Sequence, residues 1–111
     1  MSYTLFLDDL RDTSYVGLLP LSSPKIARTY EEAVYIVKNY GLPSFVYFDH
    51  DLGEEKTGYD FAKWLVVYMM DKGLGYPDNF NYYVHSANPV GKEAIIQYFK
   101  SYKKHDENLN R

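Results

Sequence analysis

The sequence contains no cysteine among its 111 residues. Disulfide bonds and thiolate metal sites are therefore excluded, and a reducing compartment is compatible with the chain. No apolar stretch approaches the roughly 20 residues that a membrane helix requires. The N-terminus lacks a basic segment followed by an apolar one, so we expect no secretory signal and a cytoplasmic protein.

An excess of positive charge is also missing, because the net charge is −3. Proteins that bind DNA mainly through its phosphate backbone are usually basic, so general DNA binding is disfavoured. Apolar residues make up 46% of the chain, which indicates a globular domain. The chain has 13 tyrosines. Most fall at helix or strand spacing, which favours packing over the alternative role of stacking on nucleotide bases.

Three short apolar runs predict strands, Tyr3–Leu7, Phe45–Phe48 and Tyr82–Val84, and Lys25–Arg28 is predicted as a short second strand. Three helix starts follow the second, third and fourth of these strands: Thr29-x-x-Glu32, Thr57-x-x-Asp60 and Asn88-Pro89. The first two are capping boxes, and the third places Asn at the cap and Pro at the first helical position. The predicted buried stripes are Ala33, Val34, Val37 and Tyr40; then Phe61, Ala62, Leu65, Val66 and Met69; then Val90, Ala94, Ile95, Tyr98, Phe99 and Tyr102.

Alternation of strands and helices predicts a three-layer α/β fold with a mostly parallel four-stranded sheet and helices on both faces. Right-handed crossovers favour the strand order 2-1-3-4, with strands two and four at the edges. The segment 11–24 shows no helical stripe and is expected to be a loop. We expect residues 1–104 to form one domain and the polar tail 105–111 to fray.

Three of the predicted strands end in polar residues that carry chemistry. Asp8-Asp9 follows the first, Asp49-His50-Asp51 the third and His85-Ser86 the fourth. The carboxyl ends of parallel strands meet at one sheet edge, where ligands bind. So many carboxylates are costly together unless a cation or protons offset their charge. We therefore predict a Mg²⁺ or Mn²⁺ site made of Asp8, Asp9, Asp49 and Asp51.

Each acid has an alternative role. Asp8 and Asp9 could cap the turn after the strand, and since adjacent strand side chains alternate, one could bind a metal directly and the other through water. Asp49 could be a metal ligand or a nucleophile; a purely structural loop acid is disfavoured, because a carboxylate directly after four apolar residues needs a partner. Asp51 could supply a carboxylate, a backbone carbonyl, or only a turn.

His85 and His50 are candidates for acid–base catalysis, because an imidazole titrates near neutral pH. Each could instead only hydrogen-bond a neighbouring carboxylate. His85 is favoured, because its strand is expected beside that of Asp49.

Ser86 and Asn88, at the start of the last helix, could hold a phosphate, although Asn88 could simply cap the helix. Arg11 and Lys92 are the candidate cations beside the acidic edge. Either could instead be a solvated surface residue or pair with the acids.

The acids at Asp8, Asp9 and Asp49, with Gly58 and Ser86-Ala87, resemble a response-regulator receiver domain. The first helix of that fold, and the fifth strand with its lysine, have no counterpart. The segments LFLDDLRD, RTYEEA, FDHDLGE, TGYDFAKWL and VHSANPVGKE are similar to a narrower family, the cyclic-phosphate processing receiver domains of bacteria and phages. That similarity spans roughly residues 4–99.

The resemblance implies a receiver fold and the handling of cyclic phosphates, at RNA ends or in cyclic nucleotides, during conflict and RNA repair. One hypothesis is a metal-dependent phosphoesterase whose partner is a nucleotide or RNA end bearing a cyclic phosphate. An alternative is a non-enzymatic module in which Asp49 accepts a phosphoryl group or the pocket binds a nucleotide. The missing lysine argues against ordinary phosphorelay. A third possibility is a small phage or host interaction protein.

Overall fold

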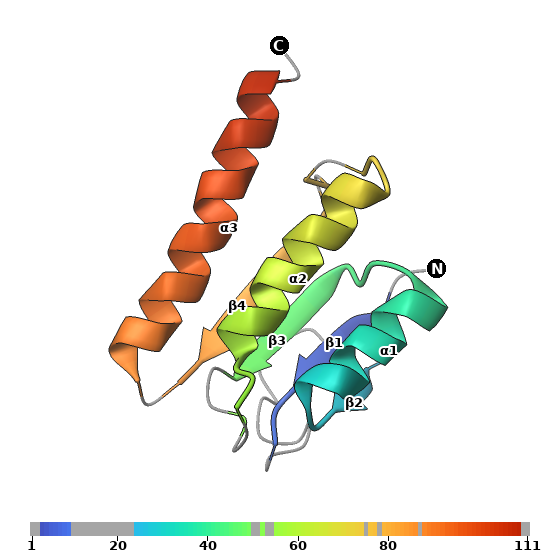
Figure 1. Ribbon diagram of the computed structural model, residues 1–111, viewed down its shortest axis with the longest axis vertical. Helices are drawn as coiled ribbons and strands as arrows, with labels where there is room; N and C mark the ends of the chain where they lie inside the picture. The colour runs from blue at the N-terminus through green and yellow to red at the C-terminus, as the bar shows by residue number, and fades with distance from the viewer. Residues whose placement is uncertain are drawn as a thin grey trace.

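The computed structural model describes residues 3–9, 24–49, 52, 55–74, 76–77, 79–86 and 88–109. Its strands are β1 (Thr4–Leu7), β2 (Lys25–Ala27), β3 (Phe45–Asp49) and β4 (Asn81–His85). Its helices are α1 (Tyr30–Tyr40), α2 (Gly58–Asp71) and α3 (Pro89–Leu109), as Figure 1 shows.

The four strands form one parallel sheet in the order β2-β1-β3-β4, which confirms the predicted topology. In its register Phe48 lies opposite Leu7 on one side and Val84 on the other. At their carboxyl ends β3 and β4 each reach one residue further than the sequence predicted, so Asp49 and His85 are paired residues at the ends of these strands. The pairing therefore fixes the positions of two candidate site residues.

Within the described residues, all three helices lie on one face of the sheet (Figure 1), whereas the sequence predicted helices on both faces. The strand order explains this difference. The connections from β2 to β3 and from β3 to β4 advance in the same direction across the sheet, so right-handed crossovers place α1 and α2 on the same side. α3 joins that layer by packing on α2 and β4.

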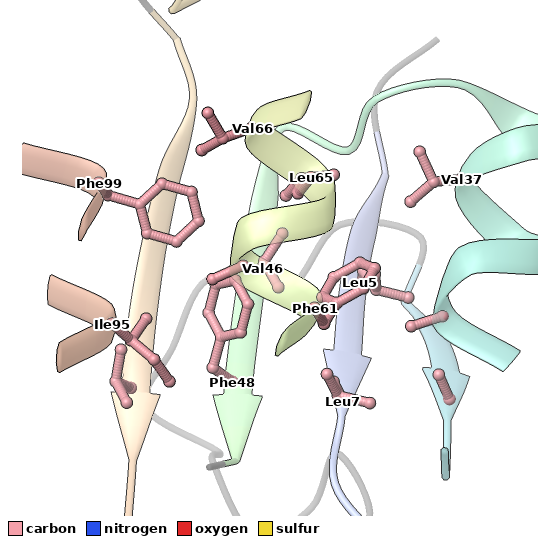
Figure 2. Close-up of a cluster of buried hydrophobic side chains, with 14 of the residues drawn as sticks. Leu5, Leu7, Val37, Val46, Phe48, Phe61, Leu65, Val66, Ile95 and Phe99 are labelled. Atoms are coloured by element: carbon pink, nitrogen blue, oxygen red, sulfur yellow. The ribbon is translucent and has the colours of Figure 1, made fainter. Parts of the chain in front are cut away.

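The main core lies between this helix layer and the sheet. The Phe48 ring lies at its centre, with centroid distances of 6.0 Å to Phe61 of α2 and 5.5 Å to Phe99 of α3. Figure 2 shows the side chains that fill this core: Leu5, Leu7, Val37, Val46, Phe48, Phe61, Leu65, Val66, Ile95 and Phe99. The whole predicted stripe of α2 is buried, since its five residues span the middle of the layer.

Two residues of the predicted helix stripes are exposed instead. Tyr40 is 59% exposed and Val90 is 78% exposed. Both lie in terminal turns, where fewer neighbours cover a side chain. The Tyr40 ring packs edge-on against Tyr3 and lies 4.0 Å from the ammonium of Lys25, so it covers the end of the sheet.

The opposite face of the sheet carries a second, smaller aromatic cluster. Phe6 and Tyr47 are both fully buried, and their rings stack with a centroid distance of 4.4 Å. Because strand side chains alternate between faces, Asp8 and Asp49 follow these two rings on the same side of the sheet. The site and the core of the helix layer are thus on different faces.

The helix starts follow the predicted capping pattern with one difference. At α2, the Thr57 hydroxyl accepts from the Asp60 N–H, and the Asp60 carboxylate accepts from the Thr57 N–H, which completes the capping box. At α1, Thr29 accepts from the Glu32 N–H, but Glu32 accepts from the N–H of Arg28, one residue before the cap. Gly41, with a φ of 87°, ends α1.

α3 continues to Leu109, although the sequence predicted fraying from His105. The Asp106 carboxylate accepts a hydrogen bond of 3.1 Å from the Tyr76 N–H, which ties this part of the helix to the segment before β4. None of the described helices has the length and apolarity needed to cross a membrane.

Replacing Thr57 by Ala should destabilise the protein by about 0.5–2 kcal/mol, because the capping hydroxyl is lost. Thr57→Ser keeps the hydroxyl and should remain within a few tenths of a kcal/mol of the wild type. Urea denaturation followed by circular dichroism measures both. Equal stability of Thr57→Ala and Thr57→Ser would show that the cap contributes nothing.

Candidate functional site

Three carboxylates meet at the carboxyl edge of the sheet. Asp8 and Asp9 directly follow β1, and Asp49 is the last residue of the neighbouring β3. One carboxylate oxygen from each residue lies within 4.8 Å of the other two. The parallel register produces this meeting, because Leu7 pairs with Phe48, and Asp8 and Asp49 are the next residues along the two segments.

Two of the three carboxylates are shielded from water. Asp8 is 0% exposed and Asp49 is 6% exposed, while Asp9 is partly exposed. The Asp8 N–H donates to the Ala27 carbonyl at 3.1 Å, which holds this residue against the end of β2. Repulsion between ionised groups increases as solvent is excluded, so ionised carboxylates here repel one another strongly. The fold thus holds the three carboxylates close together, and a bound cation would offset their repulsion.

The donor set fits a hard divalent cation. Carboxylate oxygens are the preferred ligands of Mg²⁺ and Mn²⁺, and this group offers three of them. Ligand oxygens of an octahedral Mg²⁺ stand about 2.9 Å apart in cis and about 4.1 Å apart in trans, given bonds of about 2.0–2.1 Å. The 4.8 Å limit of the cluster requires only small side-chain adjustments to reach these values.

A cation of the protein itself also reaches this edge. Arg28 follows β2, and its Nη1 donates to the backbone carbonyl of Asp8 at 3.1 Å. Arg28 was not among the predicted site residues, because the sequence placed it within the second strand. β2 is parallel to β1 and ends at the same edge of the sheet. The expectation that residues after parallel strands meet at that edge therefore applies to Arg28 as well.

His85 stands directly beside the acidic cluster in the sheet. It pairs in register with Asp49, and its ring stacks on Tyr47 with a centroid distance of 6.2 Å and an interplanar angle of 17°. Asp49 follows Tyr47 by two residues, so alternation places the imidazole and this carboxylate on the same face. His85 is half-buried and therefore keeps access to solvent.

The start of α3 is capped by its own residues. The Asn88 carboxamide oxygen accepts from the N–H groups of Val90 and Gly91, each at 3.1 Å, which confirms the predicted cap. The Ser86 hydroxyl accepts from the Asn88 N–H at 2.9 Å. These hydrogen bonds occupy backbone N–H groups that the sequence analysis predicted as phosphate ligands. The Ser86 hydroxyl keeps its own proton, because here it acts as the acceptor.

The remaining predicted site residues are Lys92, His50, Asp51 and Arg11. The Lys92 side chain lines a groove between β4 and α3, together with Tyr82 and Lys100. His50, Asp51 and Arg11 lie outside the described residues. The structure thus gathers Asp8, Asp9 and Asp49, with His85 beside them in the sheet.

A protein-family model described as the cyclic-phosphate processing receiver domain matches residues 3–101. No curated protein matches the chain. Among solved structures, one described as a yeast Spc42 trimeric coiled coil, amino acids 181–211, fused to another structure, is similar with a TM-score of 0.59. It shares 17% sequence identity, and the alignment covers 99% of this chain and 80% of that one. At this identity the likeness shows the fold alone.

Mg²⁺ or Mn²⁺ should raise the melting temperature of the wild type, because the ion binds only the assembled cluster. A concentration ten times the Kd adds about 1.4 kcal/mol of stability, which corresponds to a Tm rise of several degrees. Asp49→Asn should abolish this shift and, by relieving repulsion, should leave the metal-free protein at least as stable as the wild type. Differential scanning calorimetry measures both effects.

Asp71→Asn is the matched control, since this exposed carboxylate lies at the other end of α2. It should keep the full metal-induced shift. An equal shift in Asp49→Asn, or none in the wild type at millimolar metal, contradicts the metal site.

Proposed function

The chain belongs to the cyclic-phosphate processing receiver domain family, and on that premise we propose that it is a metal-dependent phosphoesterase that hydrolyses a cyclic phosphate. The substrate is a 2′,3′-cyclic phosphate at an RNA end or a cyclic nucleotide. The observation that carries the proposal is the cluster of three carboxylates with a histidine paired beside it. Family membership supplies the substrate class, and the cluster supplies the chemistry.

Asp8, Asp9 and Asp49 would hold Mg²⁺ or Mn²⁺ in this proposal. A bound divalent cation offsets the charge of phosphate oxygens and makes water a better nucleophile. The burial of Asp8 and Asp49 on adjacent strands keeps their carboxylates in place without further ordering. Preorganised charge of this kind costs no rearrangement during the reaction.

His85 is the proposed proton carrier. Hydrolysis forms a bond between a water oxygen and phosphorus, breaks one bond between phosphorus and a ribose oxygen, and leaves a phosphomonoester. The water loses a proton and the departing oxygen gains one. An imidazole performs such transfers near neutral pH, and the stack on Tyr47 fixes the ring plane beside Asp49.

Ser86 and Arg28 are the proposed contacts to the phosphate. The Ser86 hydroxyl retains a proton to donate, and the Arg28 guanidinium already reaches the carbonyl of Asp8. Charge-assisted donation from arginine suits a phosphate oxygen. Asn88, Lys92 and Arg11 stay predictions of the sequence as phosphate contacts. His50 stays a predicted catalytic residue and Asp51 a predicted metal ligand.

The second candidate is a non-enzymatic module that binds a nucleotide or accepts a phosphoryl group on Asp49. It is favoured by the position of Asp49 at the end of β3 beside two other carboxylates. Incubation with acetyl phosphate and Mg²⁺, followed by mass spectrometry, distinguishes it. A stable gain of one phosphoryl group on Asp49, without hydrolysis of cyclic phosphates, would establish this candidate instead.

His85→Ala should lower turnover of a 2′,3′-cyclic nucleotide by about 10²–10⁴-fold, the usual contribution of a general acid or base. The metal-induced rise in Tm should persist, because the carboxylates are unchanged. Product separation by chromatography, with and without Mn²⁺, gives the rates. Both 2′,3′-cyclic and 3′,5′-cyclic nucleotides are needed to identify the bond that is cleaved.

His105→Ala is the control, because this exposed histidine lies near the far end of α3. It should retain wild-type turnover. Full turnover in His85→Ala removes the catalytic assignment. If the metal-replete wild type hydrolyses neither substrate, the phosphoesterase proposal is wrong.

A further inference from the structure

A groove of about 540 Å³ lies between β4 and α3, away from the acidic cluster. β4 is an edge strand whose only neighbour in the described sheet is β3, so one side of the groove is an open strand edge. The other side is formed by residues of α3 from Lys92 to Lys103. The groove therefore runs along the strand that delivers His85 and Ser86 to the proposed site.

Positive charge lines the helix side of the groove. Lys92, Lys100 and Lys103 line it, and their spacing of eight and three residues places them within one stripe of a 3.6-residue helix. Eleven residues of helix rise about 16 Å, long enough for a few nucleotides of an extended strand. No acidic residue is among the described residues that line the groove.

Two acids of α3 lie near this stripe. Glu93 accepts a hydrogen bond from Gln97 on the neighbouring stripe. Asp106, beyond the last of the three lysines, accepts from the N–H of Tyr76, which lines the groove. In a chain of net charge −3, three cations on one groove are a local concentration of charge that suits an anionic partner.

Aromatic rings of β4 and of the segment before it also line the groove. Tyr82 is half-buried and packs on Phe99 with a centroid distance of 4.7 Å. Tyr76 lies under the Lys103 ammonium, which is 5.5 Å from its ring centroid. Burial raises the pKa of Tyr76 to about 12, so its hydroxyl stays neutral and adds no negative charge. Lysines that alternate with ring faces are the usual components of a surface for single-stranded nucleic acid.

We propose that this groove binds a short single-stranded segment of RNA, with phosphates on Lys92, Lys100 and Lys103 and bases against Tyr76 and Tyr82. The proposal rests on the proposed function and narrows its substrate to RNA ends. A 2′,3′-cyclic phosphate requires a ribose 2′ oxygen, so it forms only at a ribonucleotide. The groove then holds the nucleotides that precede the cyclic end, and β4 leads from them to His85.

The test is fluorescence anisotropy with a labelled octauridylate that ends in a 2′,3′-cyclic phosphate, in EDTA so that no hydrolysis occurs. The Lys100→Glu, Lys103→Glu double variant should weaken binding by about tenfold or more. The wild-type slope of log affinity against log salt should be about −2 for three phosphate contacts and should fall below about 1 in magnitude in the variant.

The matched control is the Lys38→Glu, Lys72→Glu double variant, which carries the same net charge and changes a different groove, between α1 and α2. It should bind the RNA as the wild type does. Equal losses in both double variants would mean that only net charge matters, and the groove assignment would be wrong. Competition by octaglutamate as strong as by unlabelled RNA would identify an acidic-peptide site instead.

The two proposals fail separately. Lysine-dependent RNA binding without hydrolysis of any cyclic nucleotide supports the groove and removes the phosphoesterase. Hydrolysis of a cyclic mononucleotide by a wild type that does not bind the octauridylate supports the phosphoesterase and removes the groove.

Discussion

The parallel pairing of β1 with β3, and of β3 with β4, is the constraint on which the rest of the molecule depends. It aligns Leu7, Phe48 and Val84 across the sheet, so the strands stop almost together. Whatever follows the last paired residues is brought to one edge. Asp8, Asp49 and His85 come from widely separated parts of the chain and meet there for this reason. A shift of one residue in either pairing would turn an acid to the other face.

Because side chains alternate along the strands, the residues of the main core and the residues of the site lie on opposite faces of the sheet. Leu5, Leu7, Val46 and Phe48 face the three helices and form the main core. Phe6 and Tyr47 face the other way, and the carboxylates of Asp8 and Asp49 follow them. The site is therefore built on rings that hold β1 and β3 together, while the helices cover the opposite side. Changes in the helix layer can alter stability without touching the carboxylates directly.

Much of this arrangement could be predicted from local sequence. The structure confirms the strands predicted from apolar runs, the Thr57 capping box and the buried stripe of α2. These features depend only on residues that are close together in the sequence. The meeting of Asp8, Asp9 and Asp49 followed from one topological rule. Three features could not be predicted in the same way. The one-sided helix layer depends on the direction of successive crossovers, and the exposure of Val90 depends on what lies opposite a terminal turn. The extension of α3 depends on the hydrogen bond between Asp106 and Tyr76.

The central position of β3 has a consequence for how the site responds to fluctuation. Its amides pair with strands on both sides, whereas β2 and β4 are edges of the described sheet. Local opening starts where backbone hydrogen bonds are few and exposed, so we expect the amides of Val46, Tyr47 and Phe48 to exchange hydrogen more slowly than those of the edge strands. Asp49 is attached directly to that segment. A loop motion therefore cannot move its carboxylate away from the neighbouring carboxylates. The repulsion between these groups instead lowers the stability of the folded sheet as a whole.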